Sequence, residues 1–359
     1  MIINNLSLVN FRNYQSLDIN FQKGINILSG NNGAGKTNIV EAINYLTLGK
    51  SFKTNNDEEL INFNEEYLKI NLEFVSKSKK TIQCIISKNS KKIIYNDYEI
   101  KRLSELNGKL ISVLFTPIDV NLFKDSPSLR RRFLNIYISS FDNTYLKQLS
   151  IFNNLLKERN ALLKSERIDR NYLEILDDKV IETSYPIMIK RKEIIKKLNL
   201  SINTIFQNID SSSNEISLIY KTDLDLDNYQ EYKETMKRQY KDDLQSDIRR
   251  KATSRGIHHD DMIMLLNGRE IALYGSQGQN RIGSLSLKLT MIELIKKEID
   301  EDPIIILDDV LSELDIQHQT KLLEILNNYE QVFITCADNS LLVDNASIYK
   351  IENGKLIGR

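Results

Sequence analysis

The 359-residue sequence has no tryptophan, only two cysteines and only four prolines. Cys84 and Cys336 lie far apart and have no metal-ligand spacing, which excludes a disulfide-rich or zinc-stabilised scaffold and fits a reducing compartment. We therefore interpret both cysteines as small buried hydrophobic side chains. The scarcity of proline and the lack of low-complexity linkers argue against small domains strung together by flexible segments.

Long apolar runs and an excess of charge are also missing. No run approaches the ~20 apolar residues that a membrane-spanning helix needs. The opening residues, MIINNLSLVNFRNY, lack the charged segment and apolar core of a signal peptide. Lys+Arg and Asp+Glu both number 49, so any basic face for nucleic acid must be local. We expect a cytoplasmic protein without a membrane partner.

The 41% hydrophobic content supports a core of about two to three domain-sized units. Strand patterns around one helix dominate residues 1–120. Residues 128–208 contain no glycine and show apolar stripes typical of paired antiparallel helices. Strand patterns return after Gly256. We expect an N-terminal half over 1–120, a mostly helical insert over 121–250 and a C-terminal half over 251–359.

The periodicity of apolar residues also predicts individual elements. Strands are expected at 2–9, 17–21, 24–29, 67–75, 81–88, 91–100, 110–115, 215–221, 262–266, 271–274, 303–307, 331–335, 347–351 and 355–357. Helices are expected at 38–48, 280–299 and 315–328 outside the insert. A further helix is expected at 229–251, at the end of the insert. Asn267-Gly268 and Asn353-Gly354 are hairpin turn sequences, and the first should join 262–266 to 271–274.

The segment between the strand at 24–29 and the helix at 38–48 reads GNNGAGKT and fits the phosphate-binding pattern G-x-x-x-x-G-K-[ST]. Its glycines allow the tight turn that directs backbone N–H groups at an anion. Lys36 should reach the β- and γ-phosphates of ATP, and the Thr37 hydroxyl should bind Mg²⁺. The predicted ATP-binding residues are Gly30, Asn31, Asn32, Gly33, Ala34, Gly35, Lys36 and Thr37.

The apolar run 303–307 is followed directly by two acids, Asp308 and Asp309. A buried strand that ends in aspartate delivers a carboxylate to the phosphate side of a parallel sheet. We predict that Asp308 holds Mg²⁺ through water, together with Thr37. Asp309 is the predicted catalytic group that orients or deprotonates the attacking water, and Lys36 is the second catalytic residue.

A second anion-binding pattern, GSQGQ, occupies residues 275–279 before the expected helix. Ser276 places a hydroxyl at the helix N-terminus, and Gly278 allows close backbone approach. A single triphosphate cannot fill two such sites on one chain. We therefore predict that two copies face each other, each lending Ser276, Gly278 and Gln279 to the γ-phosphate bound by the other.

The phosphate loop, the Ser-x-Gly-Gln signature, the strand ending in two aspartates and Ser312–Asp315 together resemble the ATP-binding-cassette (ABC) ATPase class, with Ser312–Asp315 as its D-loop. Within this class the chain is similar to the RecF family along essentially its whole length. The segments that carry this similarity are 10–14, 115–119, 126–134, 157–164 and 307–315. The resemblance implies an α/β fold, an ABC-type ATPase head of mixed parallel sheet, antiparallel β layer and helices, with a helical second lobe inserted in the middle.

The resemblance also implies a function. It predicts an ATP-dependent homodimer that binds single-stranded or gapped DNA in replication, recombinational repair and SOS induction. Such a protein helps to load recombinase with RecO and RecR partners, and its slow ATP hydrolysis acts as a switch. By the same resemblance Arg12 would reach the nucleotide, although a surface arginine after a strand is an equally good interpretation.

Three positions depart from the family pattern. In the stretch 256–261, Ile257 and His259 stand where the family usually has proline and arginine. Lys53 stands where the family usually has arginine, which replaces a planar fork of donors by a point charge. His258 and His259 do not indicate metal, because adjacent side chains on an extended chain point to opposite faces and no third ligand is spaced for zinc.

Arg130, Arg131 and Arg132, at the start of an expected helix, form the local basic cluster that we predict to contact DNA phosphates. A solvated charged face is the competing interpretation. Three other functions also stay open, and one of them is a protein that binds nucleotide purely as a structural element, which measured ATP hydrolysis would distinguish. A transporter-type ATPase subunit is disfavoured because Cys336 follows Thr335 where such proteins place a histidine. An SMC-like tether is disfavoured because residues 121–250 are too few for a long coiled-coil arm.

Overall fold

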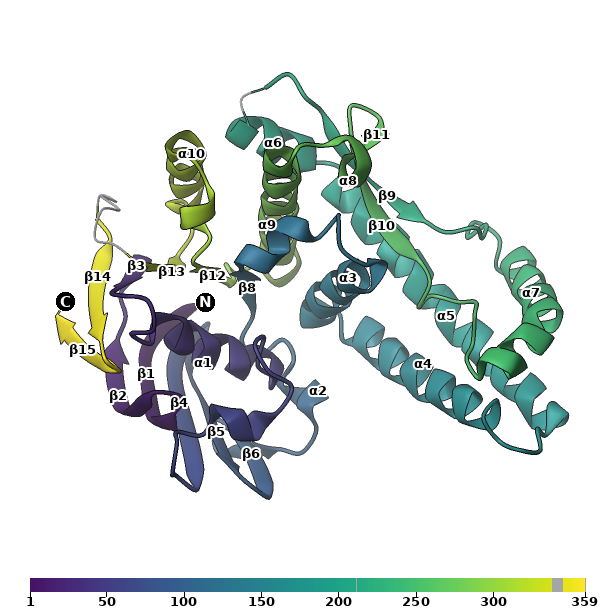
Figure 1. Ribbon diagram of the computed structural model, residues 1–359, viewed down its shortest axis with the longest axis horizontal. Helices are drawn as coiled ribbons and strands as arrows, with labels where there is room; N and C mark the ends of the chain where they lie inside the picture. Colours follow the sequence, from purple (N-terminus) through teal and green to yellow (C-terminus); the bar gives the residue numbers. More distant parts are fainter. Residues whose placement is uncertain (211, 338–344, 359) are drawn as a thin grey trace. The chain divides into compact units, whose positions relative to one another are not determined.

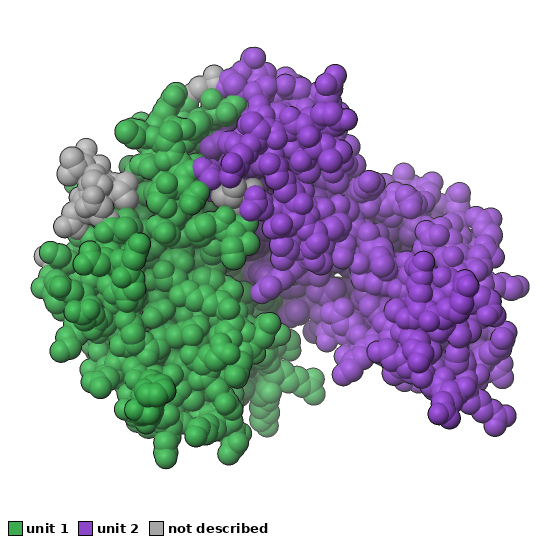
Figure 2. All heavy atoms as spheres, in the orientation of Figure 1, with its two compact units in different colours: residues 1–120, 208–211, 291–359 green, residues 121–207, 212–290 purple. Residues whose placement is uncertain are grey.

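The computed structural model describes residues 1–210, 212–337 and 345–358. The chain divides into two compact units (Figures 1 and 2). The first unit contains residues 1–120, 208–211 and 291–359, and the second contains 121–207 and 212–290. No helix within the described residues is both long and apolar enough to cross a membrane.

The first unit is built on a six-stranded sheet in the order β15-β14-β3-β13-β12-β8. Its strands are β3 (Gly24–Ser29), β8 (Ser112–Phe115), β12 (Ile304–Asp308), β13 (Gln331–Cys336), β14 (Ser347–Glu352) and β15 (Lys355–Gly358). All neighbours are parallel except β14 and β15. Strands β12 and β13 are buried along their whole length, as expected inside a parallel sheet. The carboxyl ends of β3, β13 and β12 therefore share one edge of this sheet.

A second sheet of the first unit is entirely antiparallel, in the order β2-β1-β4-β5-β6-β7. Its strands are β1 (Ile2–Phe11), β2 (Tyr14–Asn20), β4 (Tyr67–Ser76), β5 (Ser78–Ser87), β6 (Ser90–Tyr95) and β7 (Tyr98–Ile100). Along β4 every second side chain is buried, which gives the alternation of a sheet covered on one face. The structure thus has the predicted α/β fold with an antiparallel layer.

Helices complete the first unit. The helix α1 (Lys36–Leu48) begins at the phosphate loop, carries mostly buried side chains and ends at Gly49 in a left-handed conformation. The remaining short helices are α2 (Leu103–Leu106) and α10 (Ile316–Leu326), with 3-10 turns η1 (Asp57–Leu60), η2 (Pro117–Asn121) and η3 (Leu311–Glu313).

The second unit is mainly helical. Its helices are α3 (Pro127–Phe141), α4 (Asn143–Leu162), α5 (Arg170–Leu198), α6 (Ile202–Asp210), α7 (Tyr229–Arg250), α8 (Ile271–Tyr274) and α9 (Gln277–Ile299), the ends of α6 and α9 belonging to the first unit. A short connection joins α4 to α5, which lie side by side (Figure 1). A small antiparallel sheet has the order β11-β10-β9, with β9 (Ile216–Lys221), β10 (Asp261–Leu266) and β11 (Arg269–Glu270).

The prediction of a second hairpin strand at 271–274 is wrong. Asn267 and Gly268 do form the tight turn, both with positive φ, but only residues 269–270 pair with β10. The N–H of Gly275 then donates to the carbonyl of Ile271 at 2.9 Å and closes a helical turn, α8. Local helical hydrogen bonding replaces the longer hairpin.

The chain rejoins the first unit at residue 291 rather than at 251. The cause is strand pairing, because β10 pairs with β9 from Asp261↔Lys221 to Leu266↔Ile216. This ladder ties the segment after α7 to the unit that contains β9. Sequence patterns show that strands are present, but they do not show which partner a strand selects.

A buried ion network joins three helices of the second unit. Arg159 on α4 is fully buried, and its guanidinium donates to Asp177 on α5 at 2.5 Å and to Asp247 on α7 at 2.8 Å. It also donates to the hydroxyl of Thr253 at 2.8 Å, and the ring of Tyr240 lies 4.7 Å from its guanidinium carbon. Burial of these charges is tolerated because each has a partner.

We expect Arg159→Leu to lower the free energy of unfolding by roughly 3–5 kcal/mol, since it leaves two carboxylates in the interior without their cation. Urea denaturation followed by circular dichroism measures the change. Arg238→Leu is the matched control, because Arg238 is an exposed arginine on α7. Equal midpoints for the two variants would contradict a stabilising role for the network.

Candidate functional site

The loop between β3 and α1 needs glycine at two positions for both space and conformation. Gly30 and Gly35 have positive φ, 152° and 115°. A Cβ on Gly30 would lie 2.1 Å from the carbonyl oxygen of Ile351, and one on Gly35 would lie 2.6 Å from the hydroxyl of Tyr14. The loop is therefore packed closely on its surroundings and cannot accept side chains there.

Lys36 lies at the centre of this loop. Its Nζ donates to the carbonyl oxygens of Gly30 at 2.6 Å and Asn31 at 2.9 Å, and the residue is 9% exposed. Burial lowers the pKa of Lys36, whereas Asp308 and Asp309 act in the opposite direction. The ammonium is thus held where phosphate oxygens could replace the loop carbonyls as acceptors.

Asp308 ends the buried strand β12 and is itself 6% exposed. Its carboxylate accepts a hydrogen bond from the hydroxyl of Thr335 at 3.0 Å, and the side chain of Thr37 lies nearby. Burial raises the pKa of Asp308, while the neighbouring side chains of Thr37 and Thr335 and the charge of Lys53 lower it. The structure thus brings together Thr37 and Asp308, a hydroxyl and a carboxylate whose oxygen atoms fit Mg²⁺ in the presence of water and phosphate.

Asp309 is placed differently from Asp308. Its φ is 55°, and its side chain is exposed. Its N–H donates to the hydroxyl of Thr335 at 2.9 Å, and its carbonyl accepts from Ser312 at 2.9 Å. Thr335, at the end of β13, therefore holds both aspartates. Sequence reasoning missed this role of Thr335. The available signal was a hydroxyl side chain at the end of the apolar run 331–335.

Arg12 is held by a buried carboxylate that sequence reasoning also missed. Its guanidinium donates to both oxygens of Glu41, at 3.0 and 2.7 Å, and Glu41 is fully buried on α1. Ser51 donates to the same carboxylate at 2.5 Å, and Lys53 Nζ lies 3.7 Å from it. Burial lowers the pKa of Lys53, and Glu41 raises it. Contact of Arg12 with a nucleotide stays a prediction.

Two residues distant in sequence clamp the phosphate loop. The carbonyl of Ala34 accepts from the N–H of Gly354 at 3.0 Å and from Nδ2 of Asn13 at 3.1 Å. Oδ1 of Asn13 in turn accepts from Asn38 on α1 at 2.8 Å. A Cβ on Gly354 would lie 2.6 Å from the carbonyl oxygen of Asn13. The turn after β1 and the β14–β15 hairpin therefore both support the loop.

The signature segment forms the N-terminus of α9. The hydroxyl of Ser276 accepts from the N–H of Gln279 at 3.1 Å, and Oε1 of Gln279 accepts from the N–H of Ser276 at 2.8 Å. This reciprocal pair is a capping box. Ser276 and Gly278 are exposed, and Asn280 below them donates to the carbonyl of Ser276 at 2.9 Å. The segment is a hydrogen-bonded, accessible helix start in the second unit.

The structure corrects the prediction that Arg130 contacts DNA. Arg130 is 5% exposed and donates to both oxygens of Asp261, at 2.7 and 2.9 Å, as well as to three main-chain carbonyls. All its donor groups serve the fold of the second unit. Arg131 is half-buried and donates to the carbonyl of Asp260 at 2.7 Å, whereas Arg132 is exposed.

Comparison with known proteins places this geometry in a family. The RecF/RecN/SMC N terminal domain model matches residues 2–356. The DNA replication and repair protein RecF of Clostridioides difficile is 40% identical, with 99% of this chain and 98% of that protein covered. The protein of the same name in Bacillus subtilis is 37% identical over 99% of this chain and 100% of its own length.

Solved structures agree. The recombination mediator protein RecF with ATPrS, described in the RecFOR pathway, has a TM-score of 0.91 and 32% identity, covering 99% of this chain and 97% of its own. RecF with ATP has a TM-score of 0.90 and 32% identity, covering 98% and 96%. The SMC head bound to a winged-helix domain of ScpA has a TM-score of 0.59, covers 99% of this chain and 97% of its own, and at 14% identity shows the fold alone.

Gly354→Ala tests the clamp on the phosphate loop. The added Cβ collides with the backbone of residue 13, so we expect the loop to shift and ATP affinity to fall about tenfold or more. Gly268→Ala is the matched control, because Gly268 has a similar positive φ, also follows asparagine, and has no atom within 4 Å of its Cβ position. Fluorescent-nucleotide titration compares them. If Gly354→Ala and Gly268→Ala lose the same ATP affinity, backbone strain alone explains the effect. That outcome would contradict the role of Gly354 in supporting the phosphate loop.

Proposed function

The chain belongs to the RecF/RecN/SMC N-terminal domain family, and on this premise we propose that it is an ATP-gated DNA-binding switch of the RecF type. The relatives are named DNA replication and repair proteins, and the similar solved structures are of RecF with ATPrS and of RecF with ATP. The observation that carries the proposal is the position of Asp308, at the end of the buried strand β12 and close to both Thr37 and Lys36. These groups suit the phosphates of ATP with Mg²⁺.

In this proposal each residue of the site has one task. The loop amides and Lys36 bind the β- and γ-phosphates, and Thr37 and Asp308 hold Mg²⁺, which neutralises phosphate charge when bound. Thr335 fixes both aspartates through its hydroxyl. Asp309, exposed beside Asp308, orients the attacking water and can accept its proton. Hydrolysis is slow and resets the switch.

Dimerisation completes the switch. Ser276, Gly278 and Gln279 form a second, exposed anion site in the other unit, suited to the γ-phosphate held by a second copy. The dimer binds single-stranded or gapped DNA in the cytoplasm and cooperates with RecO- and RecR-type partners in gap repair, SOS induction and loading of recombinase. Similarity to RecF over nearly the full length supports this proposal over a transporter subunit or an SMC tether.

Asp309→Asn tests the catalytic assignment. We expect ATP to bind normally and single-turnover hydrolysis to slow by about 10²-fold or more, since a general base typically contributes that much. Asp300→Asn is the matched control, because Asp300 is also exposed with φ near +57°. An unchanged rate for Asp309→Asn would move the role to another group, with Glu313 the first to examine.

Ser276→Arg tests ATP-dependent dimerisation. A bulky cation at the second anion site should leave ATP bound by Lys36 and Thr37 but block the dimer, and hydrolysis with it. Analytical ultracentrifugation with ATP and Mg²⁺ measures the outcome. Asn228→Arg serves as control, because Asn228 caps α7 in the same unit and its replacement removes a helix cap without touching the signature. A full dimer of Ser276→Arg would exclude this surface from the interface.

A further inference from the structure

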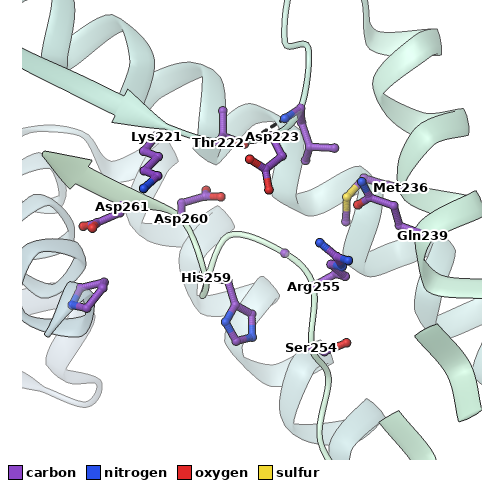
Figure 3. A pocket seen from close by; sticks show the side chains of 13 residues that line it. Lys221, Thr222, Asp223, Met236, Gln239, Ser254, Arg255, His259, Asp260 and Asp261 are labelled. Atoms are coloured by element: carbon purple, nitrogen blue, oxygen red, sulfur yellow. Dashed lines mark hydrogen bonds between the residues drawn. The ribbon is translucent and has the colours of Figure 1, made fainter. Parts of the chain in front are cut away.

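Two cavities of the second unit contain parts of the stretch 256–261 in their walls, and their charges differ. The larger, about 350 Å³, is shown in Figure 3. Its lining carries three carboxylates, from Asp223, Asp260 and Asp261, beside the two cations of Lys221 and Arg255. Such a lining has no preference for an anion.

The smaller cavity, about 240 Å³, is lined by three arginines and, among the described residues, by no carboxylate. We call it the arginine pocket, defined by Arg131, Arg132, Arg191, Ser128, Asn135 and His258, with apolar walls from Ile136, Leu149 and Phe152. Burial lowers the pKa of His258 to about 4, so this ring is neutral at pH 7. The chain as a whole has balanced charge, which makes an all-basic pocket a specific local feature.

Arg191 is the most deeply buried arginine of the arginine pocket, and Oδ2 of Asp260 lies 3.6 Å from its Nη1. It is 2% exposed and donates to Tyr145 at 3.1 Å, to the carbonyl of Ile257 at 2.9 Å and to Oδ1 of Asn135 at 2.9 Å. The same Oδ1 accepts from the Tyr145 hydroxyl at 2.7 Å. Oδ1 of Asn135 therefore already accepts two hydrogen bonds. The side-chain amide nitrogen of Asn135 is the group that can donate to a ligand.

Arg131 and Arg132 are the two arginines of the pocket that have no close carboxylate partner among the described residues. Within the described chain, neither arginine has a carboxylate oxygen within 4.0 Å, and Arg131 donates only to the carbonyl of Asp260. Burial and the neighbouring charge of Arg191 lower the pKa of Arg131, whereas the charges of Asp261 and Asp260 raise it. An anion in the pocket would act in the same direction as the two aspartates.

The arrangement on α3 suits a phosphate. Ser128, Arg131, Arg132 and Asn135 follow a spacing of three, four and seven residues, so they share one face of the helix. That face begins at the helix N-terminus, where the backbone dipole is positive. Two guanidinium forks match the geometry of phosphate oxygens, and the apolar walls can accept a sugar ring.

We propose that the arginine pocket binds a backbone phosphate of DNA, with Arg131 and Arg132 as its charged contacts. The proposal rests on the DNA-binding function proposed above and deepens it, because it assigns one contact to a built pocket. It also separates Arg131 and Arg132 from Arg130, whose donors are occupied by Asp261 and main-chain carbonyls.

The test measures binding of gapped DNA by fluorescence anisotropy with ATP and Mg²⁺ over a series of salt concentrations. Each lost phosphate contact should reduce the slope of log affinity against log salt by about 0.7–0.9. We expect Arg131→Gln with Arg132→Gln to flatten the slope by about one to two and to weaken binding several-fold at low salt. Arg238→Gln, an exposed helical arginine of the same unit, should change neither. ATP binding should be unchanged in all variants.

Each outcome decides between the proposals. If the double variant is poorly folded, Arg132→Gln alone answers the question, because Arg132 is exposed and has no recorded role in the fold. If the wild type binds DNA and the pocket variants match Arg238→Gln, the pocket assignment is overturned while the proposed function stands. If the wild type does not bind DNA, both fail.

The arginine pocket could also bind a free phosphate ion instead of a phosphate of the DNA backbone. Inorganic phosphate, titrated at constant ionic strength and followed by calorimetry, should bind the wild type weakly and compete with DNA. If phosphate binds the wild type and not the double variant, yet the DNA salt slopes of the two proteins are equal, the pocket is a site for small phosphates and the DNA assignment is overturned.

Discussion

The candidate site depends on the hydrogen bonds that a single hydroxyl, Thr335, makes to two adjacent aspartates. Thr335 lies on β13, which the sheet order places between β3 and β12. It donates to the buried carboxylate of Asp308 and accepts from the N–H of Asp309, so the strand end cannot rotate freely. A buried carboxylate without such partners would be costly. With them, Asp308 lies within reach of Thr37, and the chain can present a metal-binding pair on a rigid edge.

The sequence was sufficient for the parts of the site that are local. The glycine spacing of the phosphate loop, the apolar strand before Asp308 and the Ser276 hydroxyl at a helix start all predict geometry within a few neighbouring residues. The contacts that it could not provide join distant segments. Nothing in the local sequence singles out Glu41, which is the fully buried partner of Arg12. Periodicity along a chain does not reveal which strand or side chain will be opposite.

Arg130 shows that a run of charged residues does not reveal which of its side chains will be buried. Three consecutive arginines in a row indicate a basic surface, yet one of them bonds to Asp261 at the start of β10. The helix periodicity of about 3.6 residues sends neighbouring side chains in different directions, so one arginine enters the core while the next two border a pocket. The same logic applies to Arg159, whose partners come from α5 and α7. In this unit, arginine is as much a structural residue as a surface one.

The position of β3 in its sheet has a consequence for synthesis on the ribosome. Both its neighbours, β13 and β14, begin more than 300 residues after it, and the Gly354 amide that supports the phosphate loop follows them. Until those segments emerge, the first strand of the nucleotide site has no hydrogen-bonded neighbour in the sheet, and its loop lacks that support. Pairing over such separations is intrinsically slow. A growing chain therefore carries its nucleotide motif from the beginning but acquires the complete site only when its last strands are made.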